Sequence, residues 1–294
     1  MKVIVGMDVG GTKVAIRAET PAGGQVLDTA LDASGWEAVP AAAAASWLAE
    51  RIRGQLPPGA EVAALGVGAQ GCDSPGTAAG LRAALARRGL RAAVVNDGAL
   101  LVPAAGVDHG IGIVAGTGSI GVAADASGNP LLAGGWGWVL GDEGGAAALV
   151  RDATRAALSA REDGDGDDGL LGALETAYGV SSPEGLARAV NDNPTVANWA
   201  PHAPVVFSAA DAGSALARQV VETAAGHLAG LVSRLVRRGA VGTTVVGAGS
   251  VIVRQPRLAD AFGDQLSRRH PGMELRILTE DPVAGAVALA RRLL

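Results

Sequence analysis

The sequence has a single cysteine, an aromatic content of 3% and lysine only at positions 2 and 13 of its 294 residues. One cysteine, Cys72, can form no disulfide within the chain and cannot supply the ligands of a cysteine-bound cluster. The net charge of -5 argues against a nucleic acid or an anionic membrane surface as partner. No apolar run is long enough to span a bilayer, and the run before Asp8 is too short for a signal peptide. We therefore expect a cytoplasmic protein.

The most informative motif lies at the N-terminus, where a glycine-rich stretch follows a strand-like segment. Its glycine spacing matches a Walker A loop, but the lysine and the hydroxyl residue stand in reverse order and a second strand follows. We therefore place Gly10, Gly11, Thr12 and Lys13 at the tip of a β-hairpin whose backbone N–H groups bind phosphate. Lysine is a good point-charge phosphate ligand, and Asp8 is placed to hold Mg²⁺ through water.

Strand and helix patterns alternate along the chain and then repeat. The first hundred residues read as βββαβαβ, and a second glycine-tipped hairpin then begins the pattern again. This predicts an α/β fold of two duplicated lobes with a cleft between them. We expect the N-terminal lobe to cover residues 1–106 and the C-terminal lobe residues 107–294, with the last helix, 283–293, packing back on the N-terminal lobe.

Three later stretches come close to the dinucleotide fingerprint, but their context argues against it. A Rossmann site needs a helix directly after the glycines. Residues 66–71 are followed by a predicted loop at 72–76, residues 116–121 are followed by a strand, and residues 247–250 lack the last glycine of the fingerprint. The second and third fit an ATP cleft better, as a phosphate-facing hairpin tip and a backbone that adenosine can approach, although ordinary glycine turns are the alternative. The expected nucleotide contacts there are Gly116, Thr117, Gly118, Ser119, Gly247, Gly249 and Ser250.

Asn96 and Asp97 follow a short buried strand. Ligands of α/β sheets bind at the carboxyl ends of such strands. An ionised Asp97 could accept the proton of an attacking hydroxyl, as the catalytic aspartate of kinases does. The structural alternative is that Asp97 caps the helix that follows.

Residues 134–145 are the most distinctive stretch, because two of the chain's five tryptophans fall there among six glycines. A tryptophan face packs against the apolar face of a sugar ring, and the carboxylates of Asp142 and Glu143 can accept hydrogen bonds from its hydroxyls. The alternative is that Trp136 and Trp138 belong to the core and that Asp142 caps the next helix. We favour a polyol site.

With these motifs, the chain resembles the BadF/BadG/BcrA/BcrD-type ATPases of the actin/hexokinase/heat-shock ATPase superfamily. Within that group it is most similar to the N-acetylglucosamine and glucosamine kinases. The resemblance implies a two-lobed, ribonuclease H-like fold, ATP as co-substrate, Mg²⁺ as cofactor, a sugar as substrate and a possible homodimer. The matching runs, in the order of the family, are residues 8–13, 96–97, 116–119, 134–145, 247–250 and 281–286.

The resemblance also implies a role for each matched position. Asp97 stands at the catalytic base and Asp8 at the residue that holds Mg²⁺ through water. Gly145 stands where many relatives have serine. The remaining matches are phosphate contacts at Thr12, Lys13, Thr117 and Ser119, adenosine contacts at Gly249 and Ser250, and sugar contacts at Gln70, Asn96, Gly135, Trp136 and Asp142, with Glu143 adjacent.

These residues lead to one main hypothesis and two alternatives. The main hypothesis is an ATP-dependent amino-sugar kinase that phosphorylates the 6-hydroxyl of glucosamine or N-acetylglucosamine. A sensor of the same fold that binds ATP and sugar without transfer is the first alternative. The second, the activator ATPase of a 2-hydroxyacyl-CoA dehydratase, needs two cysteines from each subunit for its cluster, which this sequence does not have.

Overall fold

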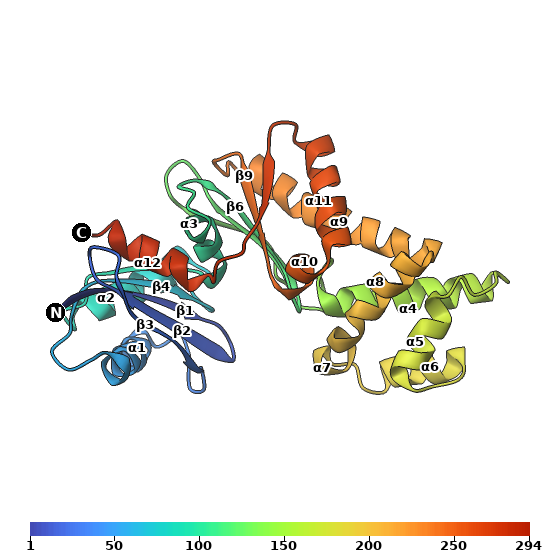
Figure 1. Cartoon of the computed structure of the whole chain (residues 1–294), viewed down its shortest axis with the longest axis horizontal. Helices are drawn as coiled ribbons and strands as arrows, with labels where there is room; N and C mark the ends of the chain where they lie inside the picture. Colours follow the sequence, from blue (N-terminus) through green and yellow to red (C-terminus); the bar gives the residue numbers. More distant parts are fainter.

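The computed structural model describes all 294 residues, which form two α/β lobes arranged along one axis (Figure 1). The first lobe is built on a five-stranded sheet in the order β3-β2-β1-β4-β5. β1 is antiparallel to β2 and parallel to β4, so the sheet is mixed. Its strands are β1 (Lys2–Val9), β2 (Lys13–Glu19), β3 (Gln25–Asp32), β4 (Glu61–Ala69) and β5 (Ala92–Val95).

The second lobe repeats this topology, with strand order β10-β9-β6-β7-β8. β6 is antiparallel to β7 and parallel to β9, so β6 occupies the place of β1. The predicted α/β duplication is confirmed, and the β1–β2 and β6–β7 hairpins occupy equivalent positions. The strands are β6 (Gly110–Ala115), β7 (Ser119–Ala124), β8 (Pro130–Gly134), β9 (Thr244–Ala248) and β10 (Glu274–Ile277).

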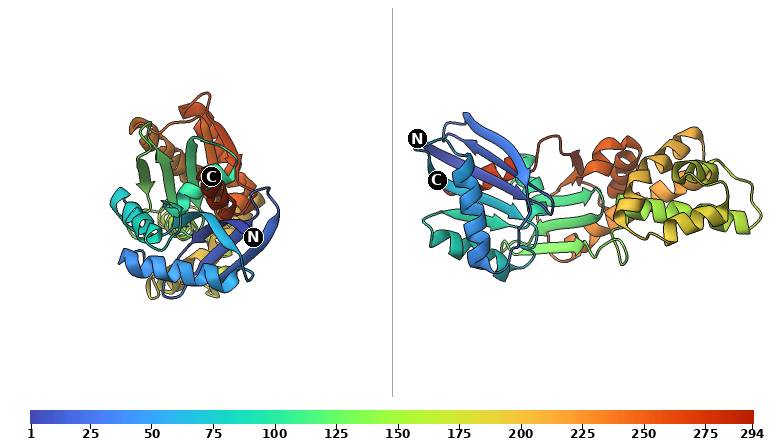
Figure 2. Two further views of the ribbon diagram at one scale, coloured as in Figure 1. Left: turned by 90° about the vertical axis from the view of Figure 1, so that its left-hand side faces the viewer. Right: turned by 90° about the horizontal axis from the view of Figure 1, so that it is seen from below.

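Helices cover both sheets, and a helical subdomain extends the second lobe away from the first, as the right panel of Figure 2 shows. The first lobe and the junction contain α1 (Ala41–Gln55), α2 (Pro75–Ala86), the 3₁₀ helix η1 (Asp97–Leu100) and α3 (Leu101–Ala104). The helical subdomain contains α4 (Ala146–Glu162), α5 (Leu170–Tyr178), α6 (Pro183–Asn191), α7 (Val196–Trp199), η2 (Ala200–His202) and α8 (Ala203–Ala212). The other helices are α9 (Ala215–Arg237), α10 (Ser250–Arg254), α11 (Pro256–Arg269) and α12 (Val283–Arg291).

The loop predicted at 72–76 is wrong in its second half, because α2 begins at Pro75. Ser74 is the N-cap and its hydroxyl accepts a hydrogen bond from the N–H of Thr77. A serine cap followed by proline at the first helical position is a common helix start, since the missing N–H of proline has no partner there in any case.

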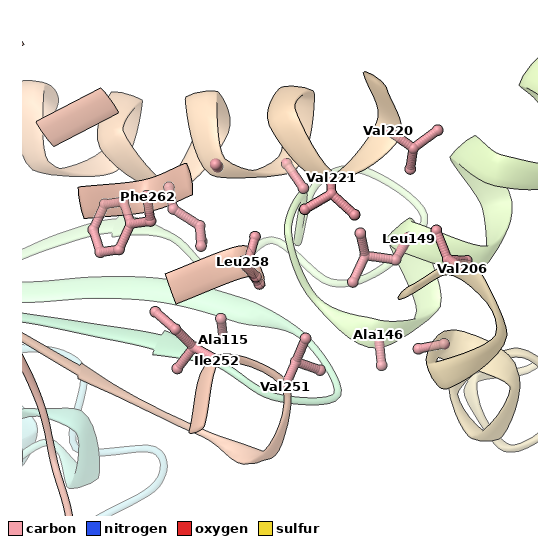
Figure 3. Packing of buried hydrophobic residues seen from close by; sticks show 14 of the residues in the cluster. Ala115, Ala146, Leu149, Val206, Val220, Val221, Val251, Ile252, Leu258 and Phe262 are labelled. Carbon is pink, nitrogen blue, oxygen red and sulfur yellow. The ribbon is translucent and has the colours of Figure 1, made fainter. Parts of the chain in front are cut away.

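Each lobe has its own hydrophobic core. Nineteen buried residues form one cluster in the first lobe, and 40 form another in the second. Figure 3 shows part of the second cluster, to which Leu149 on α4, Val221 on α9 and Phe262 on α11 contribute. The two cores are separate, and the contacts between the lobes are made by η1, α3 and α12.

No helix is both long enough and apolar enough to cross a membrane.

α12 lies across β1 and β4 of the first lobe, although it comes last in the sequence (Figure 1). Glycines in the sheet permit this close approach. A Cβ on Gly66 would lie 1.8 Å from the carbonyl oxygen of Ala286, and one on Gly6 would lie 2.6 Å from the backbone nitrogen of Val287. Only glycine fits at these two positions while the helix stays in place.

The junction between the lobes is formed by η1 and α3. η1 contacts β4 of the first lobe and β6 and β7 of the second. A Cβ on Gly98 would lie 2.7 Å from Cγ2 of Val122, so β7 of the second lobe packs closely against η1 beside Asp97.

Candidate functional site

The first group of predicted site residues lies at one edge of the first sheet. β1, β4 and β5 are parallel, so their carboxyl ends meet there. Asp8 is the second-last residue of β1, and Gln70 and Asn96 directly follow β4 and β5. The hairpin tip after β1 is closed by a hydrogen bond of 3.0 Å from the N–H of Gly10 to the carbonyl of Lys13. A Cβ on Gly11 would lie 2.8 Å from Oε1 of Gln70, so Gln70 lies against this tip.

Asp8 is the most strongly perturbed carboxyl of this edge. Burial and the nearby carboxylate of Asp97 raise its pKa from 3.8 to about 7, with Lys13 opposing the rise and Asp281 adding to it. Asp8, Lys13 and Asp281 line one hollow of about 470 Å³ together with Gly10 and other residues of the first two strands. The structure therefore brings the predicted phosphate tip and the predicted Mg²⁺ residue into the same space.

Asp97 begins η1 directly after β5. The Oδ1 atom of Asn96 accepts the N–H of Gly98 at 2.9 Å, so Asn96 is the N-cap. Oδ1 of Asp97 shares that donor at 3.0 Å. Burial raises the pKa of Asp97, the hydrogen bond from Gly98 lowers it, and the carboxylate of Asp73 raises it further. Asp97 is thus a partly buried carboxylate, and the capping role falls mainly to its neighbour.

The second group gathers at the equivalent edge of the second sheet. The N–H of Gly116 donates to the carbonyl of Gly118 at 2.9 Å, and the N–H of Ala146, the first residue of α4, donates to the carbonyl of Gly116 at 2.8 Å. The hydroxyl of the buried Ser119 donates to the carbonyl of Glu143 at 2.8 Å. These bonds fix the hairpin tip to the start of α4, so Ser119 is a structural link as well as a predicted phosphate contact.

The third glycine stretch meets the same tip. Gly249 has a φ of 103°, and a Cβ there would lie 2.5 Å from the carbonyl oxygen of Ala115. A Cβ on Gly116 would lie 3.6 Å from the backbone nitrogen of Ser250. The turn from Gly247, on β9, to Ser250 therefore lies beside the tip that holds Thr117, as an adenosine contact and a phosphate contact of one nucleotide require.

Asp142 is the one residue other than glycine with a left-handed backbone, at φ 60°. Its side chain faces the second tip, since Oδ2 would lie 2.3 Å from a Cβ on Gly118. Oδ1 is buried and has no hydrogen-bond partner. Burial raises the pKa of Asp142, and backbone N–H groups of Ser119 and Gly137 lower it. A buried oxygen without a partner calls for a donor, which a sugar hydroxyl could provide.

The two tryptophans of this segment differ. Trp138 packs edge-on against the buried Trp199, with ring centroids 4.9 Å apart, so the core alternative holds for it. Trp136 is 75% exposed and borders a hollow of about 510 Å³ that includes Glu143 and Arg237. Gly135, with a φ of 71°, turns the chain between β8 and Trp136. The sugar-binding roles of Gly135, Trp136 and Glu143 stay predictions.

No hydrogen bond or ion pair joins the tip at 10–13 to the tip at 116–119. The two groups of site residues lie on different lobes, and η1 with Asp97 stands between them, in contact with both sheets.

The residues of the first lobe suit a magnesium ion held through water. No three carboxylate, histidine or cysteine side chains are placed to ligate a metal directly. Mg²⁺ keeps several waters and is often held by one or two carboxylates together with substrate phosphates. The carboxylates of Asp8, Asp97 and Asp281 stand close enough to raise the pKa of Asp8, and a nearby cation would relieve that repulsion.

Two aspartates of this edge were not among the predicted site residues. Asp281 directly precedes Pro282, the N-cap of α12, and lines the same hollow as Asp8. Asp73 comes from the turn after β4, and its Oδ1 accepts a hydrogen bond of 2.6 Å from Nδ2 of Asn96. A signal for Asp281 was present in the sequence, because Asp-Pro precedes an apolar helical segment, but nothing in the sequence placed it beside Asp8.

Two mixed sheets of matching topology, each with a glycine-tipped hairpin at the edge where the lobes meet, define the two-lobed actin-like ATPase fold. Comparison with known proteins agrees. The sequence profile of the BadF/BadG/BcrA/BcrD ATPase family matches residues 5–290, and the chain belongs to this family.

Individual relatives and solved structures point the same way. The chain is 30% identical over 207 residues to an N-acetylmuramic acid/N-acetylglucosamine kinase of Clostridium acetobutylicum, covering 67% of this chain and 66% of the relative. It is 27% identical over 188 residues to an N-acetyl-D-glucosamine kinase of Dictyostelium discoideum, covering 62% and 59%. The chain thus spans less than two thirds of the length of both relatives. The structure of a candidate N-acetylglucosamine kinase from Chromobacterium violaceum is similar over 99% of both chains, with 24% identity and a TM-score of 0.72.

Proposed function

We propose that the protein is an ATP-dependent amino-sugar kinase that transfers the γ-phosphoryl group of ATP to the 6-hydroxyl of glucosamine or N-acetylglucosamine. The main support is the position of Asp97, a partly buried carboxylate at the junction of the lobes, beside Asp8 and the Lys13 tip. Membership of the ATPase family and the names of the two relatives support the same reaction.

In this proposal the two lobes bind the terminal phosphates of the nucleotide from opposite sides. The N–H groups of the Gly10–Lys13 tip and the Lys13 ammonium bind the terminal phosphates from the first lobe. The Gly116–Ser119 tip binds them from the second lobe, with adenosine beside Gly249. Asp8 would hold Mg²⁺ through water, where the ion neutralises charge on the phosphates.

Asp97 orients the sugar hydroxyl and accepts its proton as the hydroxyl oxygen attacks the γ-phosphorus. A carboxylate that is raised in pKa by burial is a stronger proton acceptor than an exposed one while it stays ionised. In this proposal Asp142 Oδ1, which is buried and has no hydrogen-bond partner in the chain, accepts a hydrogen bond from another hydroxyl of the ring. Closure of the lobes about η1 would bring both parts together and exclude water.

The substitution Asp97→Asn tests this assignment. It keeps the size of the side chain and an oxygen that accepts from Gly98, but it removes the base. We expect kcat to fall by about two orders of magnitude or more while the KM of the sugar changes little. Asp264→Asn, an exposed carboxylate on α11 that makes no side-chain hydrogen bond, is the matched control.

The assay should follow ADP release in parallel with ³¹P NMR of the sugar product, which reports the phosphorylated position. Turnover close to wild type in Asp97→Asn would remove Asp97 as the base. ATP and sugar binding without any phosphosugar in the wild-type protein would favour a sensor instead.

A further inference from the structure

Asp73 occupies a defined place in the candidate sugar site. Its loop begins at Gln70, which lies against the first hairpin tip, and ends at Ser74, where α2 starts. Asn96, which follows β5, donates from Nδ2 to Asp73 Oδ1 at 2.6 Å. Asn96 is 7% exposed, and its Oδ1 is occupied by the N–H of Gly98, so the amide has one orientation and Asp73 holds its nitrogen. Asp73 itself is exposed to solvent and its Oδ2 makes no hydrogen bond.

The surroundings of this free oxygen are negative. The charges that act on the same space are the carboxylates of Asp97 and, further along the edge, Asp8. No arginine or lysine forms an ion pair with Asp73. Lys13 lies in the hollow that it shares with Asp8, where the proposed function assigns it to the triphosphate. An exposed carboxylate next to a second carboxylate, with no cation from the chain, favours a cationic group on the ligand.

We propose that Asp73 is the specificity residue for an unacetylated 2-amino sugar, whose ammonium group it binds while the 6-hydroxyl faces Asp97. The inference rests on the proposed function and chooses glucosamine over N-acetylglucosamine as its substrate. An ammonium group donates to Asp73 Oδ2 and balances the two neighbouring carboxylates. An acetamide carries no charge, and its methyl group would lie against carboxylate oxygens that prefer water.

The chemistry of Asp73 allows its charge to be separated from its structural bond. In Asp73→Asn the side-chain oxygen can still accept from Asn96, so the orientation of Asn96 is kept, while the negative charge is lost. If Asp73 serves only to orient Asn96, this variant should treat all hexoses alike. If it binds the ammonium, the variant should lose glucosamine selectively.

The experiment measures kcat/KM for glucosamine, N-acetylglucosamine and glucose in wild type, in Asp73→Asn and in the control Asp264→Asn, from pH 6 to 9. For the wild type we expect glucosamine to be the best of the three, with an advantage over glucose that declines as the amine loses its proton. In Asp73→Asn we expect the ratio of kcat/KM for glucosamine to that for glucose to fall roughly 10- to 100-fold, which is the usual worth of a charged hydrogen bond. The ratio should also lose its pH dependence.

The outcomes distinguish the two levels of the argument. A wild-type preference for N-acetylglucosamine, or an unchanged ratio in Asp73→Asn, overturns the assignment of Asp73 while the kinase proposal stands. Absence of phosphorylation of all three hexoses by the wild type overturns the proposed function itself. Because glucose is measured in the same variant, a general loss of folding would lower both rates and leave the ratio unchanged, which also counts against Asp73.

Discussion

Asp8→Asn should make the ligand-free protein more stable at alkaline pH, although it removes a residue of the candidate site. The folded chain holds the Asp8 carboxyl at a pKa of about 7, compared with 3.8 in its ordinary state. Between these two values the folded protein binds a proton that the unfolded chain has lost. The free energy of unfolding therefore falls as pH rises through this window. Asparagine has no proton to lose, so the variant lacks this contribution to the pH dependence of the free energy of unfolding.

The magnitude follows from the same two values. Raising a carboxyl from 3.8 to about 7 costs the folded protein about 4 kcal/mol once the group is ionised at pH 8. More than half of that cost, on the order of 2–3 kcal/mol, develops between pH 5 and pH 8. We expect the stability advantage of Asp8→Asn over wild type to grow by this amount between pH 5 and pH 8.

Urea unfolding at pH 5, 6, 7 and 8, followed by circular dichroism, measures the difference. The lobes have separate cores, so the transition that includes the first lobe must be fitted on its own. Asp264→Asn, an exposed carboxylate on α11, provides the control and should track the wild type at every pH. Parallel pH profiles for Asp8→Asn and wild type would refute the reasoning. Mg²⁺ with ATP should narrow the gap, since a cation beside Asp8 favours its charged form.

Two further predictions concern glycines. Gly66→Ala places a Cβ 1.8 Å from the carbonyl oxygen of Ala286, so α12 must shift. We expect the free energy of unfolding to fall by about 3 kcal/mol, measured as a lower Tm. The control Gly54→Ala, which has open space around it in α1, should raise the free energy of unfolding by up to about 1 kcal/mol. Equal Tm values for the two variants would contradict the packing of α12. Gly145→Ser places a Cβ 2.6 Å from Cα of Gly118, so the second tip must move and the KM for ATP should rise roughly tenfold in steady-state assays. A KM within the error of wild type would show that the tip does not contact the nucleotide.

Much of the first lobe and the repeat could be predicted from the sequence because their signals are local. The reversed order of Thr12 and Lys13 and the β-branched run after them indicated a hairpin in place of a Walker A helix, and the structure has β1 and β2 there. The second hairpin was recognisable for the same reason. The start of α2 was not predicted, because Ser74 and Pro75, which form its N-cap and first position, fall in the stretch that the sequence analysis assigns to a loop.

The rest depends on contacts between residues far apart in the chain. Asp281 lies beside Asp8 only because α12 returns across the first sheet, and no local pattern encodes that path. The direction of the Asp142 side chain follows from its left-handed backbone and from the absence of a Cβ at Gly118. From the sequence alone Trp136 and Trp138 could not be distinguished. In the structure only Trp138 packs against Trp199 of the helical subdomain, while Trp136 stays exposed.

The return of α12 also has a consequence for synthesis on the ribosome. The face of β1 and β4 that this helix covers, including Ile4 and Ala64, is fully buried only when Val287 and Ala290 are in place. These residues are translated long after β1 and β4, so a nascent chain carries an open apolar strip on its oldest strands until α12 has emerged. Truncation of the chain before α12 should then yield a product that chaperones retain and proteases remove, even though both tips are intact.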